Sequence, residues 1–351
     1  MPFVSLPLLL EQAALSLLPV LIFLLALELI DTYKLLPLRR VLRSIMVGVI
    51  VAVICYGLNS AVYWLGCVSP PVWARTGAPL LEEIAKSLYI AWLLSRYRIG
   101  FMVDAAISGF AVGAGFALVE NLTYIPDVSS SGLLTSAIRG LGTAMMHGGS
   151  TAIFGIVSMN LSEIRGTKSS LLIFVPGLAI ATVIHELYNQ PNWRPVTAAI
   201  YVLVLLPVVM SYIFWRSEKA LEKWLGAKLD RDIDLLQMMS TGSFNSTPAG
   251  RYMQSLENSF TPEILGDMFS YLQLSIELSA RAKGDLLRRE MGFPVQSDPE
   301  LPAQLREYRW LEAQLGRTGK RALSPLTRQS RQDVWELEQL AASFEEGAAE
   351  A

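Results

Sequence analysis

The sequence predicts an all-α fold, a polytopic membrane helix bundle of about seven transmembrane helices with a C-terminal cytoplasmic helical domain. Of the 351 residues, 52% are hydrophobic and only 17% are charged, which is too apolar for an ordinary soluble domain. Long apolar runs fill residues 4–215, and charged residues are concentrated in residues 216–351. We therefore expect a membrane domain at 1–215 and a cytoplasmic domain of unknown role at 216–351.

Seven segments are apolar and long enough to cross a bilayer, which takes about 20 residues per helix. They are residues 4–30, 44–66, 77–95, 101–124, 137–160, 170–190 and 195–215. The first segment has no basic stretch before it and no small-residue cleavage site, and it is longer than the apolar part of a signal peptide. We expect it to be retained as a helix.

Basic residues in the connecting segments predict the orientation. The loops after the first, third and fifth spans and the segment after the seventh hold most of the lysines and arginines. The intervening loops and their edges hold only Arg75, Arg139 and Arg194. Because positive charge is retained on the cytoplasmic side, the N-terminus is predicted outside and the C-terminus in the cytoplasm. A miscounted helix would break this alternation.

Charge and cysteine content exclude other classes. The net charge is −2 and no basic patch with interleaved aromatic residues is present, so we expect no nucleic-acid partner. Cys55 and Cys67 form neither a disulfide framework nor a paired metal motif. Composition predicts the lipid bilayer as the surroundings of the membrane domain.

Polar and ionisable side chains are few inside the predicted spans, where a charged group costs about 2.5–3.5 kcal/mol and needs a partner or a function. The main ones are Glu82, Glu83 and Lys86 in the third span, Glu120 and Asn121 in the fourth, His147 in the fifth, and His185, Glu186 and Asn189 in the sixth. His147 and His185 are the only histidines of the chain.

The chain direction places these groups at one depth. The third span carries Glu82 in its outer third, the fourth ends outside near Glu120, the fifth carries His147 in its outer half, and the sixth ends outside with His185. Spacings of three and four residues let Lys86 pair with either neighbouring glutamate. We therefore expect one shared site that opens toward the outer face.

Two carboxylates, two histidines and an amide suit peptide hydrolysis. A buried glutamate would act as general base on water, while histidine and asparagine side chains would stabilise the oxyanion. This mechanism needs no cofactor. Zinc is the alternative. The stretch from His185 to Asn189 differs from the zinc motif H-E-x-x-H in its last residue, and asparagine is a poor zinc ligand. His147, His185 and a glutamate could still form a site, because histidine and carboxylate ligands with an open fourth position suit catalytic zinc.

These residues resemble the PrsW family of glutamic-type intramembrane proteases, within the wider superfamily of CAAX prenyl endopeptidases. Glu82-Glu83-Ile84-Ala85-Lys86 matches E-E-x-x-K, and Phe116 through Glu120-Asn121 matches F-x-x-x-E-N. His147 and His185 lie in the expected later helices, the second as H-x-x-x-N ending at Asn189. The resemblance covers residues 40–215 approximately and does not extend to the tail.

The resemblance implies a protease of a bacterial plasma membrane that cuts a single-span, membrane-anchored substrate, typically an anti-sigma factor, near the extracytoplasmic surface. It also implies that Glu82 and Glu83 supply the base, that both histidines are essential, and that Asn189 is an oxyanion donor. The CAAX pattern has histidine where Glu120 stands and arginine in place of Lys86. This departure argues against processing of prenylated proteins.

Two other classes of function use the same residues. An ion- or proton-coupled transporter would relay charge through them, although the sequence shows no repeat of the motifs. A non-catalytic membrane scaffold of the same fold would use them as structural ion pairs. The tail contains helical stretches at Leu221–Met239, Pro262–Arg289 and Pro302–Gly316, and its position predicts a cytoplasmic partner.

Overall fold

The computed structural model of the chain describes residues 25, 36–66, 68–128, 133–165, 171–190, 195–294, 298–327 and 331–350. All regular secondary structure in these ranges is helical, as the composition predicts. The chain divides into two compact units, Met1–Glu218 and Lys219–Ala351. The first predicted span, residues 4–30, lies outside the described residues apart from Leu25.

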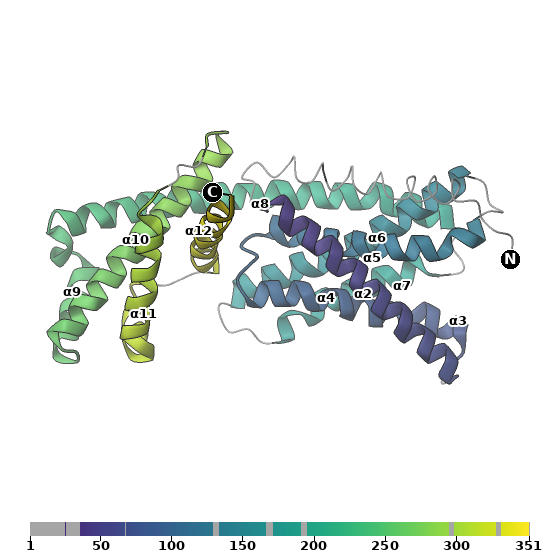
Figure 1. Cartoon of the computed structure of the whole chain (residues 1–351), viewed down its shortest axis with the longest axis horizontal. Coiled ribbons are helices and arrows are strands. Elements are labelled where there is room, and N and C mark those ends of the chain that lie inside the picture. Colours follow the sequence, from purple (N-terminus) through teal and green to yellow (C-terminus); the bar gives the residue numbers. More distant parts are fainter. Residues whose placement is uncertain are drawn as a thin grey trace. The chain divides into compact units, whose positions relative to one another are not determined.

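The helices of the first unit form a bundle. They are α2 (Leu38–Leu65), α3 (Pro70–Val72), α4 (Ala78–Ser95), α5 (Met102–Val128), α6 (Leu133–Arg165), α7 (Val175–Tyr188) and the first part of α8 (Pro195–Ser240). A π-helical turn, η1 (Trp73–Gly77), leads directly into α4, and a 3-10 turn, η2 (Leu171–Ile173), precedes α7. Figure 1 shows α2 and α4 to α7 lying side by side, and each of these helices contacts at least two of the others.

Four helical segments in the described part of the chain are long and apolar enough to cross a membrane. They are Leu38–Leu65, Met102–Thr123, Leu171–Tyr188 and Val196–Ser240. The apolar window of Met102–Thr123 is 83% buried, whereas those of the other three are 22–28% buried. Helix α5 is therefore the centre of the bundle. Helices α2, α7 and α8 present the exposed apolar surface that a lipid environment covers.

Two predicted spans, 77–95 and 137–160, correspond to α4 and α6 and are absent from this set of four. Helix α4 carries Glu82, Glu83 and Lys86 within five positions. Helix α6 is rich in small and polar residues, and every residue from 142 to 152 is buried. A helix covered by protein can be polar without facing lipid. The count of seven membrane helices therefore stays a prediction.

Close contact between α5 and α6 depends on a glycine. A Cβ atom at Gly113 would lie 2.1 Å from the backbone oxygen of His147 and 2.6 Å from the nitrogen of Gly148. No side chain fits at such separations, so Gly113 sets the distance between the central helix and the helix that carries His147.

The second unit consists of the remainder of α8, η3 (Ser243–Ser246), α9 (Pro248–Ser255), η4 (Leu256–Asn258), α10 (Pro262–Glu290), α11 (Leu301–Leu323) and α12 (Arg331–Glu350). Helix α10 packs against both α11 and α12 (Figure 1). The predicted stretch Pro302–Gly316 ends where α11 is kinked, since Gly316 has a φ of 58°. The helix continues beyond this kink to Leu323.

A buried polar cluster joins three helices of this unit. Lys283 of α10 is fully buried, and its Nζ lies 2.8 Å from Asp232 Oδ2 and 3.1 Å from Glu336 Oε1. Ser279 Oγ lies within hydrogen-bond distance of both carboxylates, so its single hydroxyl hydrogen can be donated to either one. Because Asp232 belongs to α8 and Glu336 to α12, the single ammonium group of Lys283 connects all three helices.

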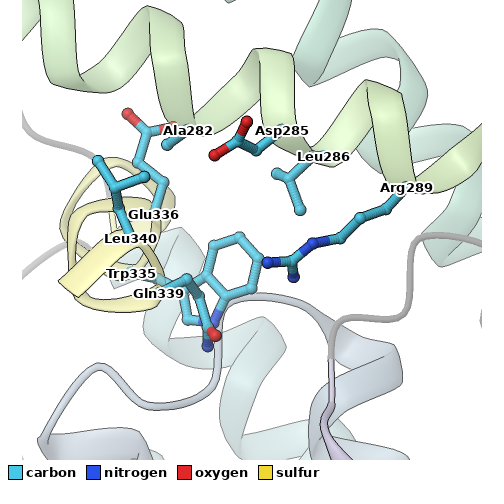
Figure 2. Close-up of a pocket in the computed structure, with 8 residues that line it drawn as sticks. All are labelled: Ala282, Asp285, Leu286, Arg289, Trp335, Glu336, Gln339 and Leu340. Carbon is cyan, nitrogen blue, oxygen red and sulfur yellow. The ribbon is translucent and has the colours of Figure 1, made fainter. Parts of the chain in front are cut away.

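A small pocket of about 20 Å³ lies beside this cluster, with room for about one water. Figure 2 shows Asp285 and Arg289 of α10 facing Trp335 and Glu336 of α12 across it. Glu336 Oε2 is buried without a hydrogen-bond partner among the described residues. Burial therefore raises the pKa of Glu336 from its ordinary value of 4.5 to about 7, although the Lys283 charge opposes the shift. The hydrogen bond with Ser279 also lowers the pKa of Glu336, whereas the nearby Asp333 carboxylate raises it.

The first prediction concerns Gly113. We expect Gly113→Ala to reduce the stability of the detergent-solubilised protein by about 1–3 kcal/mol, the usual cost of overpacking. The matched control is Gly57→Ala in α2, because nothing lies within 4 Å of a Cβ at Gly57. Thermal unfolding of both variants measures the difference, and equal melting temperatures would contradict the close contact at Gly113.

The second prediction concerns the pH dependence of α12. The folded state holds the Glu336 proton more tightly than the unfolded state, so stability falls as pH rises from about 4.5 to about 7. The total change is up to about 3 kcal/mol. Glu336→Gln should remove this pH-dependent loss of stability. Hydrogen exchange of residues 331–341 measures it, and the ratio of the exchange rate in the variant to that in wild type should fall as pH rises. Glu307→Gln, an exposed change on α11, should leave the wild-type dependence intact.

Candidate active site

Helix α4 contributes a buried ion pair. Lys86 Nζ donates to Glu83 Oε1 at 2.6 Å, and both side chains are fully buried. The three-residue spacing places the two groups on one face of the helix. Of the two pairings that the sequence allows, the structure has Lys86 bonded to Glu83.

Glu83 Oε1 is a junction between three helices. It accepts hydrogen bonds from Ser150 Oγ of α6 at 3.0 Å and from His185 Nδ1 of α7 at 2.9 Å. Glu83 Oε2 is buried and has no hydrogen-bond partner within the described ranges. This carboxylate is thus sealed from solvent and held by several donors, which is how a buried charge is tolerated.

His147 has both ring nitrogens engaged. Nδ1 lies 2.9 Å from Lys86 Nζ, and Nε2 is hydrogen-bonded to Glu120 Oε2. An ammonium group has only donors, so His147 Nδ1 acts as the acceptor. The proton of the neutral ring is then on Nε2, which donates to Glu120. The side chain of Glu120 is 25% exposed, so this end of the chain of bonds reaches the surface of the site.

His185 is oriented differently. Its Nδ1 donates to the Glu83 carboxylate, which leaves Nε2 as the unprotonated nitrogen of the neutral ring. This Nε2 lies 3.8 Å from Glu82 Oε2. The rings of His185 and His147 meet edge to face with centroids 4.7 Å apart. The two imidazoles and Glu82 therefore converge on one place.

Glu82 lies at the accessible edge of the cluster. Its side chain is 14% exposed, compared with 0% for Glu83. Its Oε1 accepts a hydrogen bond at 2.9 Å from Asn59 Nδ2 of α2, and Asn59 Oδ1 in turn accepts one at 3.0 Å from Trp73 Nε1 of η1. Sequence reasoning missed both residues. An amide within the apolar span 44–66 was the available signal for Asn59, and Trp73 had none.

The other predicted residues divide into two groups. The Phe116 ring packs 4.8 Å from the His147 ring, and Lys86 Nζ lies 5.0 Å from its centroid, so Phe116 belongs to the cluster. Asn121 instead donates to the Gly140 carbonyl at 3.0 Å, which ties α5 to α6. Asn189 is exposed at the end of α7, and its side chain makes no hydrogen bond in the described part of the chain.

Three side chains of the cluster are of the types that bind a metal ion. Ligand atoms of Glu82, His147 and His185 all lie within 4.8 Å of one another, and two histidines with one glutamate are a known zinc ligand set. His185 presents its free Nε2, and the Glu83 carboxylate behind Nδ1 is the usual support of a metal-bound histidine. His147 would have to release Glu120 or Lys86 first. The residues therefore fit zinc, with His147 as the constrained member.

The charge balance also accommodates a divalent ion. The cluster contains three carboxylates, those of Glu82, Glu83 and Glu120, and one ammonium group, that of Lys86. With these four groups ionised and both imidazoles neutral, the cluster carries a formal charge of −2, which either two protons or one divalent cation would neutralise. Both the metal-free and the zinc mechanisms are consistent with this balance.

A bundle with apolar helices and an interior cluster of ionisable side chains is typical of a membrane protein with a buried polar site. The comparison with family models identifies the class. Residues 36–213 match the family described as "PrsW family intramembrane metalloprotease", and the chain belongs to this family of intramembrane proteases. The resemblance predicted from the motifs is confirmed. Neither the curated proteins nor the solved structures include a match to this chain.

Family membership confirms an integral membrane protein and a peptide-cleaving hydrolase. The word metalloprotease in the description is compatible with the zinc alternative, which the sequence placed second to metal-free glutamate chemistry. The substrate, the orientation and the roles of individual residues stay predictions.

The third prediction concerns the contribution of the buried Lys86–Glu83 ion pair of α4 to stability. Lys86→Met should cost about 3–5 kcal/mol of stability, because it leaves Glu83 charged, buried and short of its main donor. Adding Glu83→Gln should recover most of this loss by removing the charge. Glu82→Gln should change stability by less than about 1 kcal/mol, since Glu82 lies at the accessible edge. Thermal unfolding in detergent measures all four proteins, and an unstable double variant would contradict the pairing.

Proposed function

We propose that the chain is an endopeptidase that hydrolyses a peptide bond of a single-span, membrane-anchored protein near the extracytoplasmic face of a bacterial plasma membrane. The observation that carries this proposal is the placement of Glu82. It is the partly exposed carboxylate that faces the free Nε2 of His185, while Glu83 beside it is sealed.

Glu82 is the proposed general base. A separation of 3.8 Å between Glu82 Oε2 and His185 Nε2 is too long for a direct hydrogen bond, and one water can bond to both atoms from beside the line that joins them. Glu82 takes a proton from this water as the water oxygen bonds to the scissile carbonyl carbon. The same proton then passes from Glu82 to the amide nitrogen as the C–N bond breaks. Atoms and charge balance without a cofactor.

The surrounding residues position this reaction. Glu83 and Lys86 hold the two imidazoles in fixed orientations, and Phe116 packs against His147. The N–H of His147 at Nε2 is a donor that could turn from Glu120 to the developing oxyanion. Asn189 is exposed at the end of α7, where its amide is available as a second oxyanion donor once substrate is bound.

Zinc is the second candidate mechanism, supported by the ligand atoms that converge within 4.8 Å and by the family description. Glu82, His147 and His185 would hold the ion. When bound, zinc would supply a water that ionises near neutral pH and would polarise the scissile carbonyl. In that case Glu83 supports His185 as a ligand, and Glu120 is the carboxylate left to accept a proton.

The substrate class rests on family membership and on the predicted orientation. An anti-sigma factor with one membrane span is the proposed type of substrate. The second unit, from Lys219 onward, is the proposed site for a cytoplasmic partner, which its position beyond the last predicted span supports.

The fourth prediction tests the base. Purified protein in liposomes is incubated with a single-span candidate substrate, and cleavage is followed on gels. Glu82→Gln should lower kcat by about 10²–10⁴-fold, the contribution typical of a general base. His185→Ala should also abolish most cleavage, and Glu307→Gln should match the wild type. Full activity in both site variants would refute the assignment, whereas an inactive wild type would favour a transporter or a scaffold.

The fifth prediction addresses the metal. Under the favoured mechanism, activity should survive a zinc chelator, and elemental analysis should find less than about 0.1 zinc per active chain. Loss of cleavage on chelation, with recovery on addition of zinc, would instead establish the metal mechanism.

A further inference from the structure

We propose that Asn59 and Trp73 act as a positioning pair that holds the Glu82 carboxylate in its reactive orientation, an inference that rests on the proposed function. Neither residue belongs to the motifs that identify the family by sequence. They come from α2 and η1, which contribute none of the predicted site residues.

The direction of the Asn59 amide follows from its two partners. The indole N–H of Trp73 is only a donor, so the oxygen of the amide, Oδ1, must face it at 3.0 Å. The nitrogen Nδ2 must then face Glu82, where it donates to Oε1 at 2.9 Å. Trp73 therefore determines that Asn59 presents a donor, and not an acceptor, to the carboxylate.

This donor decides which oxygen of Glu82 is free to react. An N–H bond to a carboxylate is charge-assisted and stronger than one between neutral groups. With Oε1 engaged by Asn59, Oε2 is the oxygen that lies 3.8 Å from His185 Nε2. Without Asn59, the Glu82 side chain could rotate and lose this alignment, and small misplacements of a catalytic group reduce rates strongly.

The turn η1 is built around the indole. A Cβ at Gly77 would lie 2.2 Å from Trp73 Cε3 and 2.3 Å from Cζ3, so the ring folds back over a position that only glycine permits. Isolated π-helical turns occur frequently at functional sites. Because η1 leads directly into α4, the residue that orients Asn59 is tied to the helix that carries Glu82.

The position of Asn59 within an apolar helix also supports the positioning role. Leu58 and Ser60, the neighbours of Asn59, are exposed, whereas Asn59 is partly buried between Trp73 and Glu82. An amide in a span costs free energy unless it is hydrogen-bonded. Both hydrogen-bonding atoms of Asn59 are used, and one of its two partners is the proposed base.

The test uses the full-length protein in liposomes with the substrate of the previous experiment. We expect Asn59→Leu to lower kcat by about 10–100-fold with KM within about twofold of wild type, because substrate binding does not use this amide. Trp73→Phe and Gly77→Ala should each lower kcat by a smaller factor, since the first removes the indole N–H, the second displaces it, and both leave Asn59 in place. The matched controls are Asn160→Leu, an exposed amide on α6, and Trp64→Phe, an indole of α2 that is 87% exposed.

A second readout does not depend on cleavage. The indole N–H signal of Trp73, assigned by its loss in Trp73→Phe, should shift in nitrogen–proton NMR spectra of Asn59→Leu and stay in place in Asn160→Leu. An unmoved signal, or wild-type kcat in Asn59→Leu, would overturn this inference while leaving the proposed protease intact. A wild type that cleaves no substrate would overturn the proposed function and the positioning role with it.

Discussion

The buried ion pair of Glu83 and Lys86 is the interaction on which the rest of the site depends. Each member also bonds to a histidine from another helix, Glu83 to His185 and Lys86 to His147. Desolvation makes such a pair expensive, so it persists only with additional hydrogen bonds. The histidines supply these hydrogen bonds and are oriented by them. The same contacts therefore stabilise the buried charges and fix the positions of the two imidazole rings.

The three carboxylates of the cluster occupy three environments, and this difference sorts their roles. Glu83 is buried and accepts several hydrogen bonds. Glu120 accepts a hydrogen bond from the N–H of His147 at Nε2. Glu82 lies at the accessible edge, and Asn59 donates a hydrogen bond to one of its oxygens. Environment separates the behaviour of chemically identical groups in many hydrolases. Here it separates the sealed carboxylate of Glu83 from two partly exposed ones, of which Glu82 faces His185 and Glu120 faces His147.

The bundle accommodates this polarity by its arrangement. Central helix α5 is largely buried, and α6 is covered along residues 142–152, so the most polar helix surfaces meet protein. The exposed apolar windows belong to α2, α7 and α8. Helices α4 and α6 carry most of the polar cluster and are not among the four described segments that are long and apolar enough to cross a membrane. The polar side chains that form the site therefore lower the hydropathy of the helices that carry them, which makes these helices harder to recognise as membrane spans.

The sequence by itself determined the helical class, the family and most of the cluster. Its motifs identified the family, helical spacing placed neighbouring polar residues on one face, and chain direction placed the polar groups of four helices at one depth. The predicted residues that do converge are Glu82, Glu83, Lys86, Phe116, Glu120, His147 and His185. Only the tertiary structure decided that Lys86 pairs with Glu83, that Asn121 bonds to α6, and that Asn59 and Trp73 reach Glu82. The physical reason is that periodicity constrains residues within one helix, whereas contacts between helices depend on how each helix is rotated and packed against its neighbours.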